Sequence, residues 1–117
     1  MSLQSDFFTL AGPIFTGRVY PNVAPDLVEK PYLTYSRISG LEETTLDTNG
    51  GVNNLRNTRL QLDVWAATYG EAQAKAEALR TALKTWAVPN VFQSDQDMYE
   101  ADTKLHRVML DISTWHE

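Results

Sequence analysis

The feature that most constrains the fold is an alternating segment followed at once by a helical pattern. From Thr58 to Ala67, apolar and polar residues alternate, which predicts a β-strand with one buried face and one wet face. Over residues 68–87, apolar residues instead recur every three or four positions, which predicts one long amphipathic helix. Because the helix can cover the apolar face of the strand, the pair predicts an α+β domain.

The predicted helix carries its own start and stop signals. Thr68 and Glu71 have the spacing of a capping box, in which the threonine hydroxyl accepts from the backbone of Glu71. Pro89 disfavours helical backbone at the residue before it, so we expect the helix to end by residue 87. The apolar positions on its predicted inner face are Ala72, Ala76, Leu79, Leu83 and Trp86.

Further strands are indicated at residues 31–39 and 107–113, where polar and apolar residues again alternate. Residues 98–103 are a candidate hairpin partner of the last strand, and a short N-terminal helix is expected to stop at Gly12-Pro13. We therefore expect one domain over 1–117: an antiparallel or mixed sheet of three to five strands with both helices packed on one face. The predicted core consists of Leu60, Leu62, Val64, Leu79, Leu83, Trp86, Val108, Leu110 and Ile112.

Residues 40–57 differ from the rest because they contain almost no large apolar side chains. Asn49-Gly50-Gly51 within this segment is a strong turn signal. The segment therefore predicts a long polar hairpin arm, or a flexible arm, that projects from the sheet.

Composition excludes several classes of function. The chain has 117 residues, enough for one core, and no cysteine, which excludes disulfide scaffolds, thiolate metal sites and cysteine nucleophiles. Its net charge of −5 argues against binding to nucleic-acid phosphates, which favours a basic surface. No apolar run is long enough for a membrane span, and Asp6 interrupts the N-terminal segment, so we expect neither a membrane segment nor a secretory signal.

No known catalytic or phosphate-binding motif is present. His106 and His116 do not stand in any recognisable arrangement with an acid and a nucleophile. The acidic run lacks the glycine of a calcium loop, so we interpret it as a solvated turn; its members are Asp95, Asp97, Glu100 and Asp102. The sequence therefore predicts no enzyme, no cofactor and no metal site.

Interface residues are the remaining candidates. Trp65 lies on the polar face of its strand beside Arg59, and tryptophan next to arginine is typical of interface anchors. A second helix covering Trp65 is an equally good interpretation. The arm carries acidic residues close to basic ones, which suits contact between like subunits or simply a solvated hairpin. The candidate interface residues are Arg56, Arg59, Trp65, Glu42 and Glu43.

An ordered set of short segments resembles the tailed-phage and prophage family of tail completion proteins, also described as tail terminator or tail-to-head joining proteins. The resemblance runs from about residue 14 to 117. The segments that carry it are RVYP at 18–21, AP at 24–25, PYLTYSRISG at 31–40, LQLDVWA at 60–66, TYGEA at 68–72 and DISTW at 111–115. Family members commonly begin with a longer amphipathic helix, which Gly12-Pro13 shortens here.

The resemblance implies a structural protein that caps the tail tube and forms the tail-to-head joint as a ring, often a hexamer. Its implied partners are further copies of itself, the tail tube protein and the head connector protein, without a cofactor. The implied location is the head–tail junction of a virion made in the cytoplasm of a bacterial host. The alternative is a non-viral cytoplasmic protein-binding module that uses the polar face of the sheet.

Overall fold

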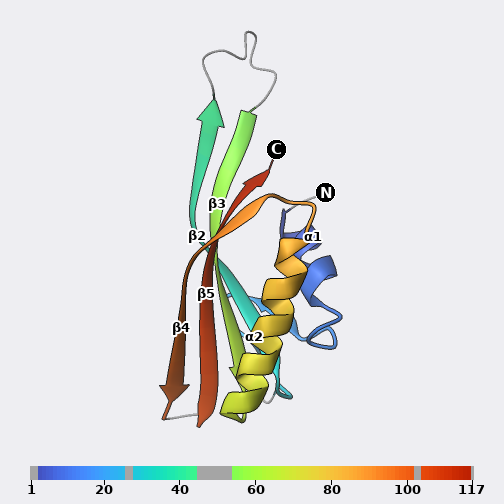
Figure 1. Ribbon diagram of the computed structural model, residues 1–117, viewed down its shortest axis with the longest axis vertical. Helices are drawn as coiled ribbons and strands as arrows, with labels where there is room; N and C mark the ends of the chain where they lie inside the picture. The colour runs from blue at the N-terminus through green and yellow to red at the C-terminus, as the bar shows by residue number, and fades with distance from the viewer. Residues whose placement is uncertain (1–2, 26–27, 45–53, 102–103, 117) are drawn as a thin grey trace.

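The computed structural model describes residues 3–25, 28–44, 54–101 and 104–116. Five strands form one sheet in the order β1-β2-β3-β5-β4, with β1 parallel to β2 and all other neighbours antiparallel. Both helices lie on the same side of this sheet (Figure 1). The expected α+β fold with a mixed sheet is confirmed. In chain order the elements are α1 (Leu3–Ala11), β1 (Val19–Pro21), β2 (Tyr32–Thr44), β3 (Asn54–Ala66), α2 (Tyr69–Lys84), β4 (Asn90–Glu100) and β5 (Leu105–His116).

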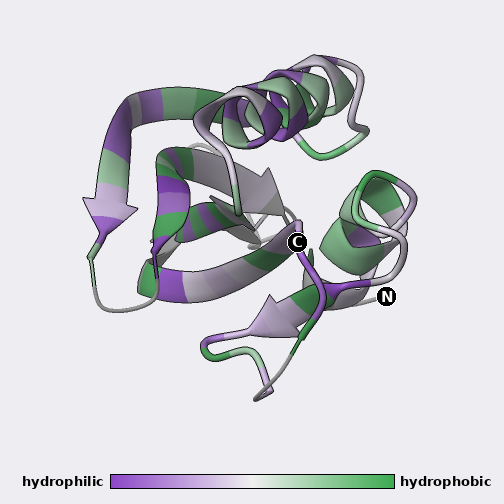
Figure 2. Cartoon of the chain, turned by 90° about the horizontal axis from the view of Figure 1, so that it is seen from below, coloured by the Kyte–Doolittle hydropathy of each residue, from purple (hydrophilic) through white to green (hydrophobic). Residues whose placement is uncertain are grey.

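The core fills the space between the helices and the sheet. The inward positions of β3 and β5 are fully buried, as the alternation predicts, and they pack against the apolar face of α2. Trp86 is only partly buried, at the edge of this core. Phe7 of α1, Phe15 and Leu33 of β2 belong to the core as well. Hydrophobic segments, coloured green in Figure 2, occur on both helices and on the strands of the sheet.

The start of α2 follows its sequence signal. Thr68 has extended backbone, and its hydroxyl accepts a hydrogen bond of 3.2 Å from the backbone N–H of Glu71. This bond satisfies one of the free N–H groups at the helix start. Neither helix in the described part of the chain is long and apolar enough to cross a membrane.

The end of α2 comes at Lys84, earlier than the expected residue 87. The backbone N–H of Thr85 bonds back into the last turn and closes it. The side-chain amide of Asn90 then donates to the carbonyl oxygen of Leu83 at 3.0 Å. These contacts satisfy carbonyl groups that a continuing helix would have used. The helix therefore ends several residues before the position at which Pro89 would disfavour helical backbone.

The N-terminal helix α1 ends at Ala11, as Gly12-Pro13 predicts. A Cβ atom at Gly12 would lie 2.8 Å from the carbonyl oxygen of Phe8, so only glycine fits this close approach without movement. The following turn is held to α2 by Lys75, whose ammonium donates to the carbonyl oxygen of Ile14 at 3.0 Å.

The predicted arm is a hairpin where the structure describes it. The register of β2 and β3 continues to the pair Thr44 and Asn54, with a bulge between Arg37 and Ser39. The pair extends beyond the helices in Figure 1, and the molecule measures 53 × 25 × 23 Å. The Asn49-Gly50-Gly51 turn lies outside the described residues.

The acidic run is a strand and not the expected turn. Asp95, Asp97 and Glu100 lie on β4, which pairs with β5 over its length, while residue 102 is outside the described part. The carboxylate of Asp95 accepts a hydrogen bond of 2.8 Å from Arg80 on α2. Pairing with β5 and this ion pair favour strand backbone despite the low apolar content of the segment. Of the expected hairpin partner at 98–103, residues 98–100 are therefore the end of a longer strand, and residues 102–103 lie outside the described part.

Candidate interaction surfaces

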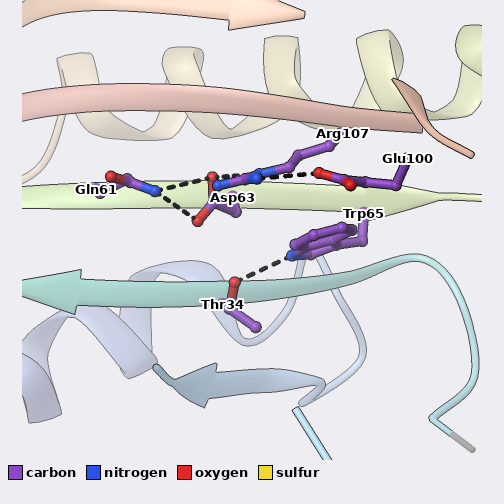
Figure 3. A network of polar contacts seen from close by, with 6 residues as sticks. All are labelled: Thr34, Gln61, Asp63, Trp65, Glu100 and Arg107. Carbon is purple, nitrogen blue, oxygen red and sulfur yellow. Dashed lines mark hydrogen bonds and ion pairs between the residues drawn. The ribbon is translucent and has the colours of Figure 1, made fainter. Parts of the chain in front are cut away.

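Two of the interface candidates, Arg59 and Trp65, lie on the sheet face opposite the helices, and this face is less exposed to solvent than its sequence predicts. Asp63 in the middle of this face is only 6 % exposed. Trp65 and Arg107 are half-buried there. Cross-strand neighbours, and not a further helix, remove these side chains from water (Figure 3). The alternation thus identifies the correct face but overestimates its exposure.

Trp65 is fixed from the side of β2. Its indole N–H donates to the hydroxyl of Thr34 at 3.0 Å. Its ring stacks on that of Tyr32, with centroids 6.0 Å apart and planes 14° from parallel. Burial raises the pKa of the Tyr32 phenol above its ordinary value. Trp65 is therefore neither a fully exposed anchor nor covered by a second helix.

Arg107 of β5 connects three strands across this face (Figure 3). Its Nε donates to Asp63 of β3 at 3.0 Å, and its Nη1 donates to Glu100 of β4 at 3.2 Å. The same guanidinium lies 5.0 Å from the centre of the Trp65 ring. Gln61 completes the set by donating to Asp63 at 3.1 Å. Nearly buried Asp63 thus has its charge balanced and its oxygens hydrogen-bonded.

The two candidate arginines have neighbours within their own subunit. Arg59 donates to the carboxylate of Asp111 on the adjacent strand β5. The backbone of Arg56 pairs in register with that of Glu42 across the β2–β3 hairpin. Glu43 pairs in the same ladder with Leu55. Contact of these residues with a neighbouring subunit stays a prediction.

No arrangement for chemistry is apparent in the described ranges. Among the described residues, no group of three or more histidine, cysteine and acidic side chains lies close enough to hold a metal ion. Two shallow depressions share Trp86 and Val88 at the end of α2, and their linings do not bring an acid, a base and a nucleophile together.

Comparison with known proteins decides the family. Residues 9–117 match the family model described as tail completion protein gp17. The chain belongs to this family. The tail completion protein also resembles, in fold, a chain of a structure titled "Virion of native gene transfer agent (GTA) particle", with a TM-score of 0.67 and 18 % sequence identity. That match covers 97 % of this chain and 93 % of the other, whereas no curated protein matches.

Membership makes this tail completion protein a structural component of a phage virion, and the expected family resemblance is confirmed. Sequence reasoning missed the part that Arg107, Tyr32 and Thr34 play around Trp65. The outward alternation places Arg107 on the polar face, but only the strand register brings it beside Asp63 and Trp65. The alternation of polar and apolar residues therefore predicts which face of the sheet these residues occupy, but it does not predict which residues they contact.

Proposed function

We propose that this tail completion protein closes the end of the tail tube and forms the joint to the head as a ring of identical subunits. The observation that carries the proposal is the family match over residues 9–117. The proposal needs no cofactor and assigns no catalytic role. Its partners are further copies of the chain, the tail tube protein and the head connector protein, and its place is the head–tail junction.

The shape of the subunit supports this role. A joint between two assemblies needs one surface for neighbouring subunits and others for the two partners. The molecule is 53 Å long, and its β2–β3 hairpin extends past the helices (Figure 1). The two ends of the molecule and the long edges of the sheet are therefore different surfaces, so contacts with the two partners and with neighbouring subunits need not compete for one surface.

The interface residues expected from the sequence remain part of the proposal. Arg59 keeps a side chain that is 41 % exposed despite its ion pair with Asp111, so it can also contact a neighbour. Exposed ion pairs contribute under about 1 kcal/mol each. Contacts of this kind would therefore leave the isolated subunit monomeric in dilute solution, with the tube end promoting ring assembly.

Deletion of the gene from an inducible prophage that encodes the chain tests the proposal. We expect electron microscopy to show tails of uncontrolled length, or finished tails that do not join heads. Expression of the unaltered gene from a plasmid should restore normal particles and serves as the control. Normal infectious particles without the protein would contradict the proposal.

A further inference from the structure

Two strand edges of the sheet have no partner strand in the described part of the chain. β4 (Asn90–Glu100) pairs with β5 on one side and stands at the end of the sheet on the other. At the opposite end, β1 pairs with β2 only along Leu33–Tyr35, so residues 36–44 of β2 lie beyond the strand that covers them. An open edge presents unpaired backbone donors and acceptors to any strand that approaches it.

The β4 edge combines a carboxylate with exposed aromatic rings. Asp97 is exposed. Its carboxylate accepts a long hydrogen bond of 3.5 Å from the hydroxyl of Tyr69 and has no ion pair among the described residues. Tyr69 and Tyr99 are each more than half exposed, and both rings contact His106. A carboxylate beside aromatic faces attracts a cationic side chain.

The β2 edge carries the complementary chemistry. Arg37 is exposed, and within the described ranges its guanidinium has no ion pair or hydrogen bond. The bulge leaves its neighbour Ile38 without an opposite residue on β3, and Ile38 is 48 % exposed. A bulge of this kind redirects side chains at the edge of a sheet. The edge therefore offers a free cation next to an apolar side chain.

Charge and strand direction select one pairing of these edges. On β4, Asp95 and Glu100 are paired with Arg80 and Arg107, whereas Asp97 has no ion pair among the described residues, so two β4 edges that bring their Asp97 side chains together would repel each other. β2 is antiparallel to β3, β3 to β5 and β5 to β4, which makes β4 antiparallel to β2. Two subunits related by rotation about an axis along the strands would then meet as an antiparallel pair. Repeated head-to-tail contacts of this type close into a ring when the rotation between neighbouring subunits divides a full turn evenly.

We propose that β4 of one subunit docks against the open part of β2 of a second copy, with Asp97 and Tyr99 facing Arg37 and Ile38 of that copy. The inference rests on the proposed ring and names two sheet edges that meet in it, in addition to the contact proposed for Arg59. It places the contact between subunits at opposite edges of the sheet. The half-buried network around Trp65 lies outside this contact.

Cysteine cross-linking tests the contact because the natural chain has no cysteine. Ile38→Cys and Gln96→Cys place thiols beside Arg37 and Asp97 and leave both charges in place. When the two variants are mixed at high concentration, we expect a disulfide-linked dimer at least about tenfold more abundant than in a mixture of either one with Ala78→Cys. Ala78 is an exposed position on α2 and serves as the matched control.

Charge exchange is a second, independent test. Arg37→Glu or Asp97→Lys alone should weaken the association of subunits at least about tenfold, because like charges then face each other. The double variant should recover association. Unchanged melting temperatures would show that the exposed substitutions leave the subunit folded. Equal association of single and double variants would overturn the proposed contact.

The same cross-linking in particles from the complemented prophage separates this inference from the proposed function. The variant with both Ile38→Cys and Gln96→Cys should give a ladder of linked subunits that ends at the closed ring. A ring seen by electron microscopy without this ladder would overturn the edge contact and leave the proposed function standing. A ladder in particles whose tail ends show no ring would support the contact and contradict the ring.

Discussion

The guanidinium of Arg107 lies 5.0 Å from the centre of the Trp65 ring while its Nε donates to Asp63 at 3.0 Å. One side chain on β5 thus organises two neighbours on β3. A cation over an aromatic ring and a hydrogen-bonded ion pair both gain strength when they are partly removed from water. The centre of the polar sheet face is therefore a fixed structural element.

Removal of Arg107 should destabilise the subunit strongly. Arg107→Ala leaves the nearly buried carboxylate of Asp63 without its charge partner, so we expect a loss of about 2–4 kcal/mol in the free energy of unfolding. Urea denaturation measures this loss. As a control, Arg107→Ala combined with Asp63→Ala should cost less than the sum of the two single variants. Additive costs would show that the two groups do not interact.

The titration of Tyr32 should depend on Trp65. Burial raises the pKa of this phenol from its ordinary value of 10.0, and Trp65→Ala exposes the ring, so the pKa should fall toward that value. Because the pKa of Tyr32 is higher in the folded state than in the unfolded state, the protonated phenol favours folding. This contribution to the free energy of unfolding is fully present below the unfolded-state pKa and is lost as pH rises through the folded-state pKa. Phenolate absorbance measures the titration, with Tyr32→Phe to assign it; an unchanged curve would contradict the prediction.

Truncation of the helix face should be costly. Leu79 and Leu83 of α2 are buried against the sheet, so Leu79→Ala and Leu83→Ala should each lower the free energy of unfolding by roughly 2–5 kcal/mol. Thermal denaturation measures both effects. Lys84→Ala at an exposed position of the same helix is the control and should change little. If the double leucine variant melted at the unchanged temperature, the packing of α2 on the sheet would be wrong.

The cap of α2 makes a smaller contribution. Thr68→Ala removes the hydroxyl that accepts from Glu71, which should cost about 1 kcal/mol. Thr68→Ser retains the oxygen and should keep most of this stability. Chemical denaturation of the two variants side by side tests the cap. Equal losses would mean that the methyl group of Thr68, and not its hydroxyl, is what stabilises the helix.

Arg59 offers a test that separates folding from assembly. Its ion pair with Asp111 is partly exposed, so Arg59→Gln should change the free energy of unfolding by less than about 1 kcal/mol. Arg59→Glu faces Asp111 with a like charge and should cost somewhat more. If Arg59 also contacts a neighbouring subunit, Arg59→Glu should block complementation of the deleted prophage although the subunit folds. Full complementation would remove Arg59 from the interface.

Part of this fold was accessible from the residues alone because its patterns are local. The alternation before Thr68 and the helical spacing after it predicted β3 and α2, since each buries one face against the other. Gly12-Pro13 placed the end of α1 in the same way. Strand β1 was not predicted, because three residues carry no periodicity and pair only through contact with β2. The candidate Trp65 was placed on the correct face, but its partners come from other strands.

The sequence by itself determined the fold class, the long helix, most of the core and the resemblance to tail completion proteins, because hydrophobic periodicity and short motifs act over neighbouring residues. Only the tertiary structure decided the order β1-β2-β3-β5-β4 and the register that brings Arg107 to Asp63 and Trp65. It also made the acidic run a strand at the edge of the sheet. Pairing between distant strands depends on contacts that no local pattern encodes, and it is this pairing that left Asp97 and Arg37 at opposite edges.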